Sequence, residues 1–137
     1  MRKGFTLIEL LIVLAVIAAL MAVATPLALN AVKNAKASQV AQNLRALKTA
    51  VENYFYAEKE LPDGTKAIVS YISANFDWSK YDLSADDDDN LDDGIGKVVI
   101  SYTGGDVKYQ DVVKHLPETT PVDTDKPGVE IVLRKYW

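Results

Sequence analysis

The feature that most constrains this chain of 137 residues is a long apolar stretch close to its beginning. Residues 10–29 carry no charged side chain, and only Thr25 and Pro26 interrupt the run of apolar residues. At about 1.5 Å per residue, some 20 helical residues cross a hydrocarbon core of about 30 Å. The stretch therefore predicts a membrane-spanning helix. Arg2 and Lys3 precede it, so the positive-inside rule predicts a cytoplasmic N-terminus and an extracytoplasmic remainder.

Charge is distributed unevenly along the rest of the chain. Residues 31–56 carry four Lys and Arg against one Glu, whereas residues 57–137 carry 17 Asp and Glu against 9 Lys and Arg. Such an acidic segment argues against direct binding of nucleic acid, which requires clustered Lys and Arg. The sequence contains no cysteine, which excludes a disulfide framework.

The helix is expected to continue beyond the apolar stretch. Residues 40–55 repeat apolar side chains at spacings of three and four, which predicts an amphipathic helix. We expect one helix from about Phe5 to Glu58, with a possible kink at Pro26 and a turn over residues 61–64.

The remainder predicts an α+β fold with a small antiparallel sheet of about three strands. The β-branched and aromatic run 97–103 and the segment 106–113 are separated by Gly104-Gly105 and predict a hairpin. Residues 129–134 alternate in polarity and predict a last strand. Residues 68–76 indicate a short second helix. A sheet this small cannot bury one face alone, so the apolar stripe of the long helix is expected to cover it.

The N-terminus combines three features that need one explanation. A short basic leader ends in Gly4, the apolar run begins at once with Phe5, and one carboxylate, Glu9, lies within it. A charged side chain in a membrane span costs at least about 2.5 kcal/mol on insertion scales and usually marks a functional site. Glu9 is therefore a candidate functional residue.

Residues 1 to about 30 resemble the class III signal of type IV pilins and type II secretion pseudopilins. The match rests on the segment Gly4 to Leu11, on the apolar helix that follows, and on Pro26, where many such subunits place a helix-breaking proline. The chain lacks the cysteine pair of many larger pilins and the calcium motif of the major pseudopilins. The resemblance implies a structural filament subunit of a type IV pilus, serving adhesion, surface motility or DNA uptake. A pseudopilin of a type II secretion or competence system is the alternative.

The resemblance also implies a processing and assembly route. A prepilin peptidase would remove residues 1–4 by cutting between Gly4 and Phe5, and would then methylate the Phe5 amine. The mature subunit would wait in the inner membrane until an assembly ATPase and a platform protein moved it into a homo-oligomeric cell-surface filament. Residues 5–30 would form the filament core, and residues 31–137 the extracytoplasmic head.

Within such a core, Glu9 is expected to meet the Phe5 amine of a neighbouring subunit. The residues alone favour the same pairing, because a lone carboxylate in a dry helix bundle needs a partner and a new N-terminal ammonium is the nearest cation.

Two simpler interpretations of the N-terminus stay open. Residues 22–24 read Ala-Val-Ala, which resembles a signal-peptidase site, so the stretch could be an ordinary secretory signal. The chain could also be a membrane-anchored protein with a small external domain. Neither alternative explains why Gly4 and Phe5 occur together with Glu9.

Other candidate sites are weaker. The acidic run suggests a calcium site, although its spacing does not fit an EF-hand and a solvated loop is the alternative; its acids are Asp86, Asp87, Asp88, Asp89, Asp92 and Asp93. His115 has no second metal ligand near it in sequence. The aromatic run 54–56 is expected to pack in the core, and Trp137 either packs on the head or faces a partner. With no recognisable nucleophile or phosphate loop, we expect neither an enzyme nor a cofactor.

Overall fold

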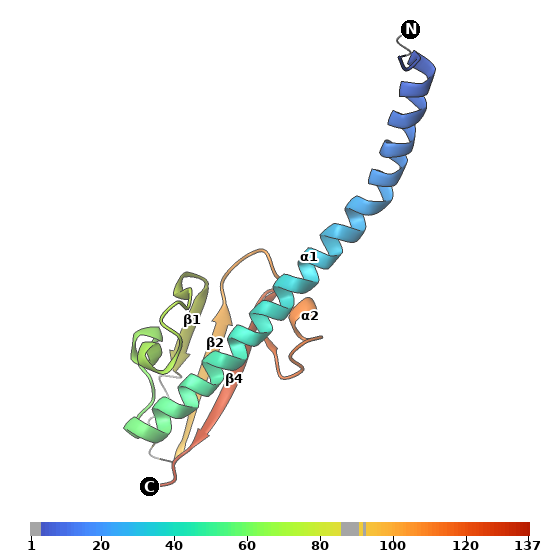
Figure 1. Ribbon diagram of the computed structural model, residues 1–137. Helices are drawn as coiled ribbons and strands as arrows, with labels where there is room; N and C mark the ends of the chain where they lie inside the picture. The colour runs from blue at the N-terminus through green and yellow to red at the C-terminus, as the bar shows by residue number, and fades with distance from the viewer. Residues whose placement is uncertain (1–3, 86–90, 92) are drawn as a thin grey trace. The chain divides into compact units, whose positions relative to one another are not determined.

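The computed structural model describes residues 4–85, 91 and 93–137. The chain divides into two compact units, an N-terminal unit that ends at Asn34 and a C-terminal unit, Ala35–Trp137. The elements follow one another as α1 (Leu7–Glu58), η1 (Thr65–Tyr71), η2 (Trp78–Lys80), β1 (Tyr81–Ala85), β2 (Ile95–Tyr102), α2 (Tyr109–Val112), β3 (Thr120–Asp123) and β4 (Lys126–Arg134), where η1 and η2 are 3₁₀-helices (Figure 1).

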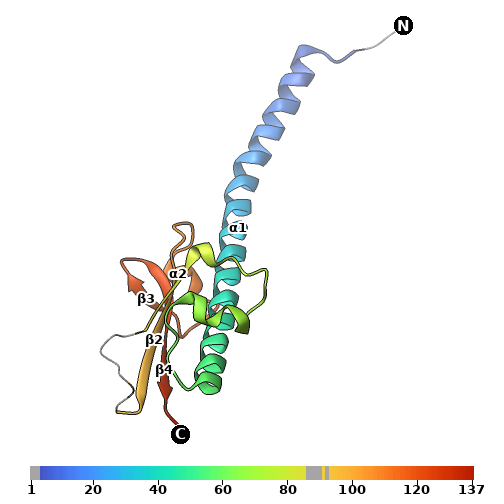
Figure 2. The same cartoon turned by 90° about the vertical axis from the view of Figure 1, so that its left-hand side faces the viewer.

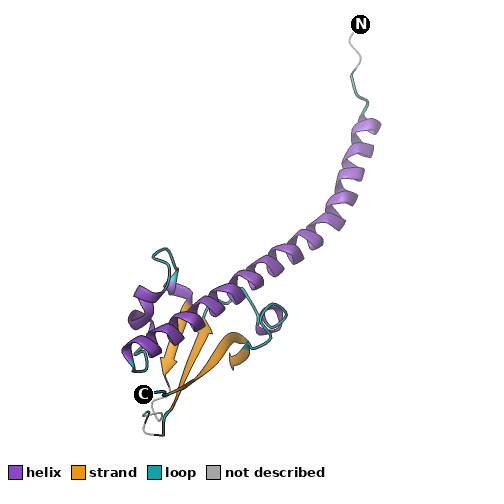
Figure 3. Ribbon diagram, turned by 60° about the horizontal axis from the view of Figure 1, so that its bottom comes forward, coloured by secondary structure: helices purple, strands orange, loops and turns teal. Residues whose placement is uncertain are grey.

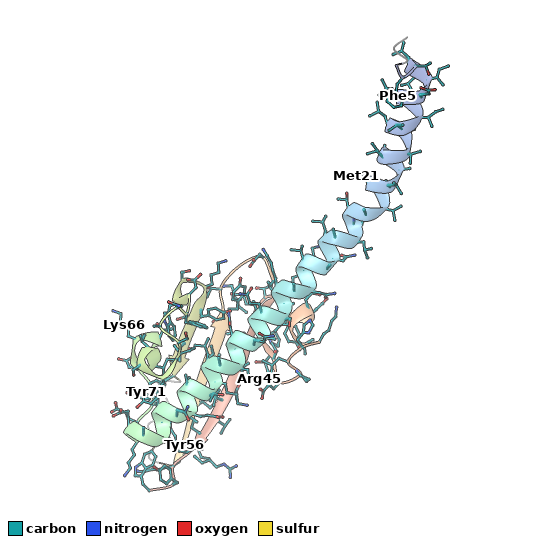
Figure 4. The ribbon with its side chains drawn as sticks, in the orientation of Figure 1. Phe5, Met21, Arg45, Tyr56, Lys66 and Tyr71 are labelled. Carbon is teal, nitrogen blue, oxygen red and sulfur yellow. The ribbon has the colours of Figure 1, made fainter. Side chains whose placement is uncertain are left out.

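In the N-terminal unit, the described structure is the first part of α1. The helix runs through Pro26 without interruption, although proline lacks the N–H that would bond to the carbonyl four residues earlier. The large apolar side chains from Phe5 to Val32 are between 47% and 84% exposed. Figure 4 shows them projecting outward around Met21. Among the described residues, α1 is the one helix long and apolar enough to cross a membrane. A kink at Pro26 stays a prediction.

The C-terminal unit contains a four-stranded antiparallel sheet in the order β1-β2-β4-β3. The central pair β2 and β4 places Ile100 opposite Val129. Figures 2 and 3 show the second part of α1 lying along this sheet. The α+β class is confirmed, but the prediction of about three strands is wrong, because the sheet has four.

The helix stripe predicted from the sequence forms one side of the core. Its residues Val40, Leu44, Leu47, Val51 and Phe55 are at most 4% exposed. The other side consists of alternate strand residues, including Leu83, Val98, Ile100, Val129, Ile131 and Leu133. Burying apolar surface contributes about 25 cal/mol per Å², so this contact is the main source of stability for the C-terminal unit.

The helix α1 ends at Glu58, as predicted, but through a residue that the sequence did not single out. Lys59 has φ 61°, in the left-handed region, and its N–H donates to the Phe55 carbonyl at 2.9 Å. This is the αL termination that glycine usually provides. Gly64, within the turn predicted over residues 61–64, also has a positive φ of 80°. The helix predicted within 68–76 is the 3₁₀-helix η1, which begins and ends earlier.

The predicted strand over residues 106–113 is wrong. Half of this segment forms the helical turn α2, after which the Val113 N–H donates to the Tyr109 carbonyl at 3.0 Å. The buried residues Val112 and Leu116 are four apart, which is a helical spacing. The strand beside β4 is β3, whose residues are all exposed and which contains Pro121, as an edge strand tolerates.

Candidate functional site

Three of the four candidate residues predicted near the N-terminus lie in or beside a single exposed turn. Phe5 is 84% exposed, and α1 begins two residues later at Leu7. Figure 4 labels Phe5 at this end of α1. Gly4, Phe5 and Glu9 therefore lie within or directly before the first turn of α1, whereas Pro26 lies several turns further along the same helix.

Thr6 and Glu9 form two reciprocal hydrogen bonds that begin the helix. The Thr6 N–H donates to Glu9 Oε2 at 3.0 Å, and the Glu9 N–H donates to Thr6 Oγ1 at 3.2 Å. This is a capping box, in which two side chains satisfy backbone N–H groups that the helix itself cannot pair. A carboxylate in the first turn also interacts favourably with the helix dipole.

Thr6 is therefore a hydrogen-bond partner of Glu9 that was not predicted from the sequence. The pattern of Thr or Ser followed three residues later by Glu before an apolar run is a known start signal for helices, and it was present as Thr6-Leu7-Ile8-Glu9. The prediction treated Glu9 as a carboxylate without a partner in its own chain. In the structure Oε2 has one, while Oε1 accepts no hydrogen bond from the described residues.

Gly4 occupies open space. A Cβ atom added to it would meet no atom within 4 Å among the residues that the structure describes. Packing against the described residues therefore does not require glycine at position 4. A requirement for glycine here would have to come from another molecule that contacts the segment.

A second polar cluster lies in the C-terminal unit, between α1 and the sheet. Lys36 Nζ lies 3.1 Å from Asp106 Oδ2, and the Tyr102 hydroxyl donates to Asp106 Oδ1 at 2.6 Å. Asn43 donates to the Tyr81 hydroxyl at 2.8 Å, and the Tyr81 and Tyr102 rings pack edge to face at 5.2 Å. The residues line a cleft of about 170 Å³.

The charges of this cluster stabilise one another. The hydrogen bond from Tyr102, followed by that from Lys36, lowers the pKa of Asp106 to about 2. Burial, followed by the bond to Asp106, raises the pKa of Tyr102. The cluster joins α1 to the segment after β2, which gives it a structural role. No local sequence pattern could have indicated a contact between residues 70 positions apart.

Most of the suggested calcium site lies outside the described residues, namely Asp86 to Asp89 and Asp92. Asp93 is described, and its Oδ1 accepts a hydrogen bond from the Ile95 N–H at 3.1 Å. Within residues 4–85, 91 and 93–137, no three His, Cys, Asp or Glu side chains form a group that could hold a metal ion. Calcium binding stays a prediction.

Of the aromatic run 54–56 at the end of α1, which was expected to pack in the core, only Phe55 does so, because Tyr54 is partly buried and Tyr56 is 48% exposed. Phe55 is fully buried and contacts the Trp137 ring, with 5.2 Å between centroids. The Tyr136 hydroxyl donates to the Tyr56 carbonyl at 2.9 Å; Figure 4 labels Tyr56 near the end of α1. Tyr54 donates to Glu60 at 2.7 Å, and this bond is the main reason that its pKa rises to about 12.

Comparison with known proteins identifies relatives of both the N-terminal segment and most of the chain. The sequence model of a family described as "Prokaryotic N-terminal methylation motif" matches residues 1–25. A type IV major fimbrial protein FimA of Dichelobacter nodosus is 36% identical over 110 residues, which cover 74% of this chain and 62% of that protein. A second FimA from this organism is 30% identical over 108 residues, covering 66% of this chain and 69% of that protein.

A fimbrial protein of Pseudomonas aeruginosa is 37% identical over 102 residues, which cover 74% of this chain and 60% of that protein. The chain thus spans less than two thirds of the length of the first FimA and of this protein. No solved structure matches the chain.

Proposed function

Because this chain belongs to the type IV pilin family, we propose that it is the structural subunit of a type IV pilus, which polymerises through α1. The observation that carries this proposal is the exposure of the N-terminal unit, whose large apolar side chains are between 47% and 84% exposed. An apolar surface this extensive requires lipid or other protein to cover it. A membrane before assembly and a bundle of identical helices after assembly would each do so.

Processing comes first in the proposed route. A prepilin peptidase cuts between Gly4 and Phe5 on the cytoplasmic side of the inner membrane and methylates the new Phe5 amine. The support is the match of residues 1–25 to the N-terminal methylation motif, together with the open space around Gly4. Intact-mass spectrometry of the membrane-bound subunit is expected to show loss of residues 1–4 and gain of one methyl group. A mature N-terminus at Thr25 would instead establish an ordinary secretory signal.

Assembly follows processing. The mature subunit is held in the inner membrane by the first part of α1, and an assembly ATPase and platform protein move it into the filament. There Glu9 pairs with the Phe5 amine of a neighbouring copy. The chain supplies no other charged side chain between Lys3 and Lys33, so a cationic partner for Glu9 has to come from an N-terminus or from another molecule. Since both charges lose water, such a pair serves to fix the stagger between subunits more than to add stability.

A pilus is favoured over a secretion or competence pseudopilus because the relatives reported above are named as fimbrial proteins. The decisive experiment is to shear cells and identify the protein in the released fibres. Abundant long fibres composed of this chain, absent from a deletion strain, are expected. If the medium contains no such fibres and deletion abolishes export of another protein, the chain is a pseudopilin.

A further inference from the structure

We propose that Thr6 is a positioning residue for filament assembly, which holds the Glu9 carboxylate so that one oxygen faces a partner subunit. The inference rests on the proposed filament function and assigns a role to a residue that this function leaves unexplained. It makes Thr6 a requirement for correct pairing of Glu9 with the amine of another copy.

The first argument is the geometry of the two hydrogen bonds. Glu9 Oε2 accepts from the Thr6 N–H at 3.0 Å, so the side chain folds back over the start of α1. Thr6 Oγ1 in turn accepts from the Glu9 N–H at 3.2 Å. The backbone of each residue is thus held by the side chain of the other. A glutamate without this contact would sample several rotamers, and ordering it on assembly would oppose binding.

The second argument is how the two carboxylate oxygens are used. Oε2 is occupied by the bond within the chain, and Oε1 accepts no hydrogen bond from the described residues. The turn is exposed, with Ile8 at 69% and Phe5 at 84%. One carboxylate can accept several hydrogen bonds, so the contact with Thr6 and a contact with an ammonium group are compatible. The capping box therefore orients Glu9 and still allows its carboxylate to form an ion pair.

The third argument concerns what each substitution removes. Thr6→Val keeps the size and branching of the side chain but loses the oxygen, whereas Thr6→Ser keeps the oxygen. Glu9→Gln keeps an oxygen that can accept from the Thr6 N–H but loses the charge, since Gln serves in a capping box as Glu does. Glu9→Leu loses both. These four variants separate the orienting contact from the charge.

The experiment expresses each full-length variant in a deletion strain and measures sheared fibre relative to mature, membrane-bound subunit. Thr6→Val is expected to lower this ratio by about fivefold, the shift that loss of a typical N-cap gives to an equilibrium. Thr6→Ser is expected to give a ratio of fibre to membrane-bound subunit close to that of the wild type. Glu9→Gln is expected to lower fibre yield through loss of the charge.

A second measurement tests whether Thr6 acts through Glu9. If it does, adding Thr6→Val to Glu9→Gln lowers the yield further by much less than Thr6→Val alone, because coupled substitutions are not additive. Hydrogen exchange of the detergent-solubilised mature subunit provides a readout without assembly. The Glu9 amide is expected to exchange faster in Thr6→Val and at the wild-type rate in Thr6→Ser.

Three outcomes would overturn the inference. In the first, Thr6→Val forms fibres normally while Glu9→Gln does not, which leaves the proposed function intact and removes the role of Thr6. In the second, Thr6→Ser fails as severely as Thr6→Val, so the hydroxyl is irrelevant. In the third, Thr6→Val accumulates unprocessed precursor, which would make Thr6 part of peptidase recognition. Normal fibres from both Glu9→Gln and Glu9→Leu would instead refute the proposed pairing of Glu9 itself.

Discussion

Among individual residues, Lys59 adopts the left-handed backbone conformation that ends α1, although lysine adopts this conformation less readily than glycine does. It terminates α1 with φ 61° and donates to the Phe55 carbonyl at 2.9 Å. A left-handed conformation costs an L-residue roughly 1–2 kcal/mol, a cost that glycine avoids. Helices commonly place glycine at this position for that reason.

Lys59→Gly is therefore expected to raise the free energy of unfolding by about 0.5–1 kcal/mol, after allowance for the greater freedom of glycine in the unfolded chain. Lys59→Ala is the matched control, because it removes the charge and side chain but keeps Cβ and hence the strain. Urea unfolding of the detergent-solubilised protein, followed by fluorescence of the two tryptophans, measures both variants. Equal effects of Gly and Ala would attribute the change to the lysine side chain and not to the backbone.

Asp106 is expected to make the folded protein less stable at acid pH. Its usual pKa of 3.8 is lowered to about 2 by Tyr102 and then Lys36. The folded state therefore binds the proton less readily than the unfolded state. The stabilisation is complete above about pH 4 and is lost as the pH falls towards 2.

Asp106→Asn is expected to lower stability at pH 7 and to make the decline between pH 4 and pH 2 shallower. Urea midpoints measured at several pH values test this directly. Asp111→Asn is the control, because the Asp111 carboxylate has Lys114 at 3.4 Å as its partner, without a tyrosine. If both variants follow the same pH dependence, the cluster around Asp106 contributes nothing particular to acid stability.

At the scale of elements, strand β4 provides a matched test of the core. Val129 and Val132 are the same residue type on one strand, 1% and 51% exposed respectively. Val129→Ala is expected to destabilise the protein by about 1.5–3 kcal/mol, through lost burial and the cavity left behind. Val132→Ala loses the same β-propensity but little burial, and should cost less than about 1 kcal/mol. Similar costs at both positions would contradict the assigned faces of the sheet.

The elements predicted correctly are those whose pattern repeats over many residues. The helix α1 was predicted to within two residues, because its apolar run and its stripe together cover most of its 52 residues, none of which is glycine. β2 and β4 were predicted approximately, from β-branched content and alternation. β1 and β3 were missed since they have only five and four residues and depend on pairing with longer strands.

In the candidate site too, contacts between residues close in sequence were predictable, whereas contacts between residues far apart in sequence were not. Gly4, Phe5 and Glu9 were singled out because they are adjacent in sequence and chemically unusual there. The capping contact of Thr6 with Glu9 is also local, but its sequence pattern was not used in the prediction. By contrast, the contact of Lys36 with Asp106 and that of Lys48 with Glu118 each join residues 70 positions apart. Only the fold brings such pairs together.

At the scale of the whole molecule, the two units differ in how much of their apolar surface is exposed to solvent. The first buried residue along α1 is Ala37, which belongs to the C-terminal unit. The C-terminal unit contains the entire described core, while the apolar side chains of the N-terminal unit are exposed. Charged side chains are concentrated in the C-terminal unit, where residues 35–137 carry 18 Asp and Glu against 12 Lys and Arg, whereas residues 10–29 of the N-terminal unit carry none.

A shortened chain of residues 31–137 is therefore expected to be a soluble monomer that unfolds cooperatively without detergent. None of the described residues that are removed, 4–30, has a buried side chain, so the free energy of unfolding should stay within about 0.5 kcal/mol of that of the detergent-solubilised full chain. The large apolar side chains still exposed, such as Val69 and Val132, come from separate elements, and scattered exposure of this kind is normal. A net charge of −5, from 18 acids and 13 bases, also opposes association.

Sedimentation velocity provides the measurement for this prediction, with the full chain in detergent-free buffer as the control. The full chain is expected to form large assemblies, since its apolar helix then has only other copies to cover it. The shortened chain should sediment as a single monomeric species at every concentration tested. Well-folded shortened chain that forms large assemblies would show that the C-terminal unit carries an association surface of its own, and polymerisation could then no longer be assigned to the N-terminal part of α1 alone.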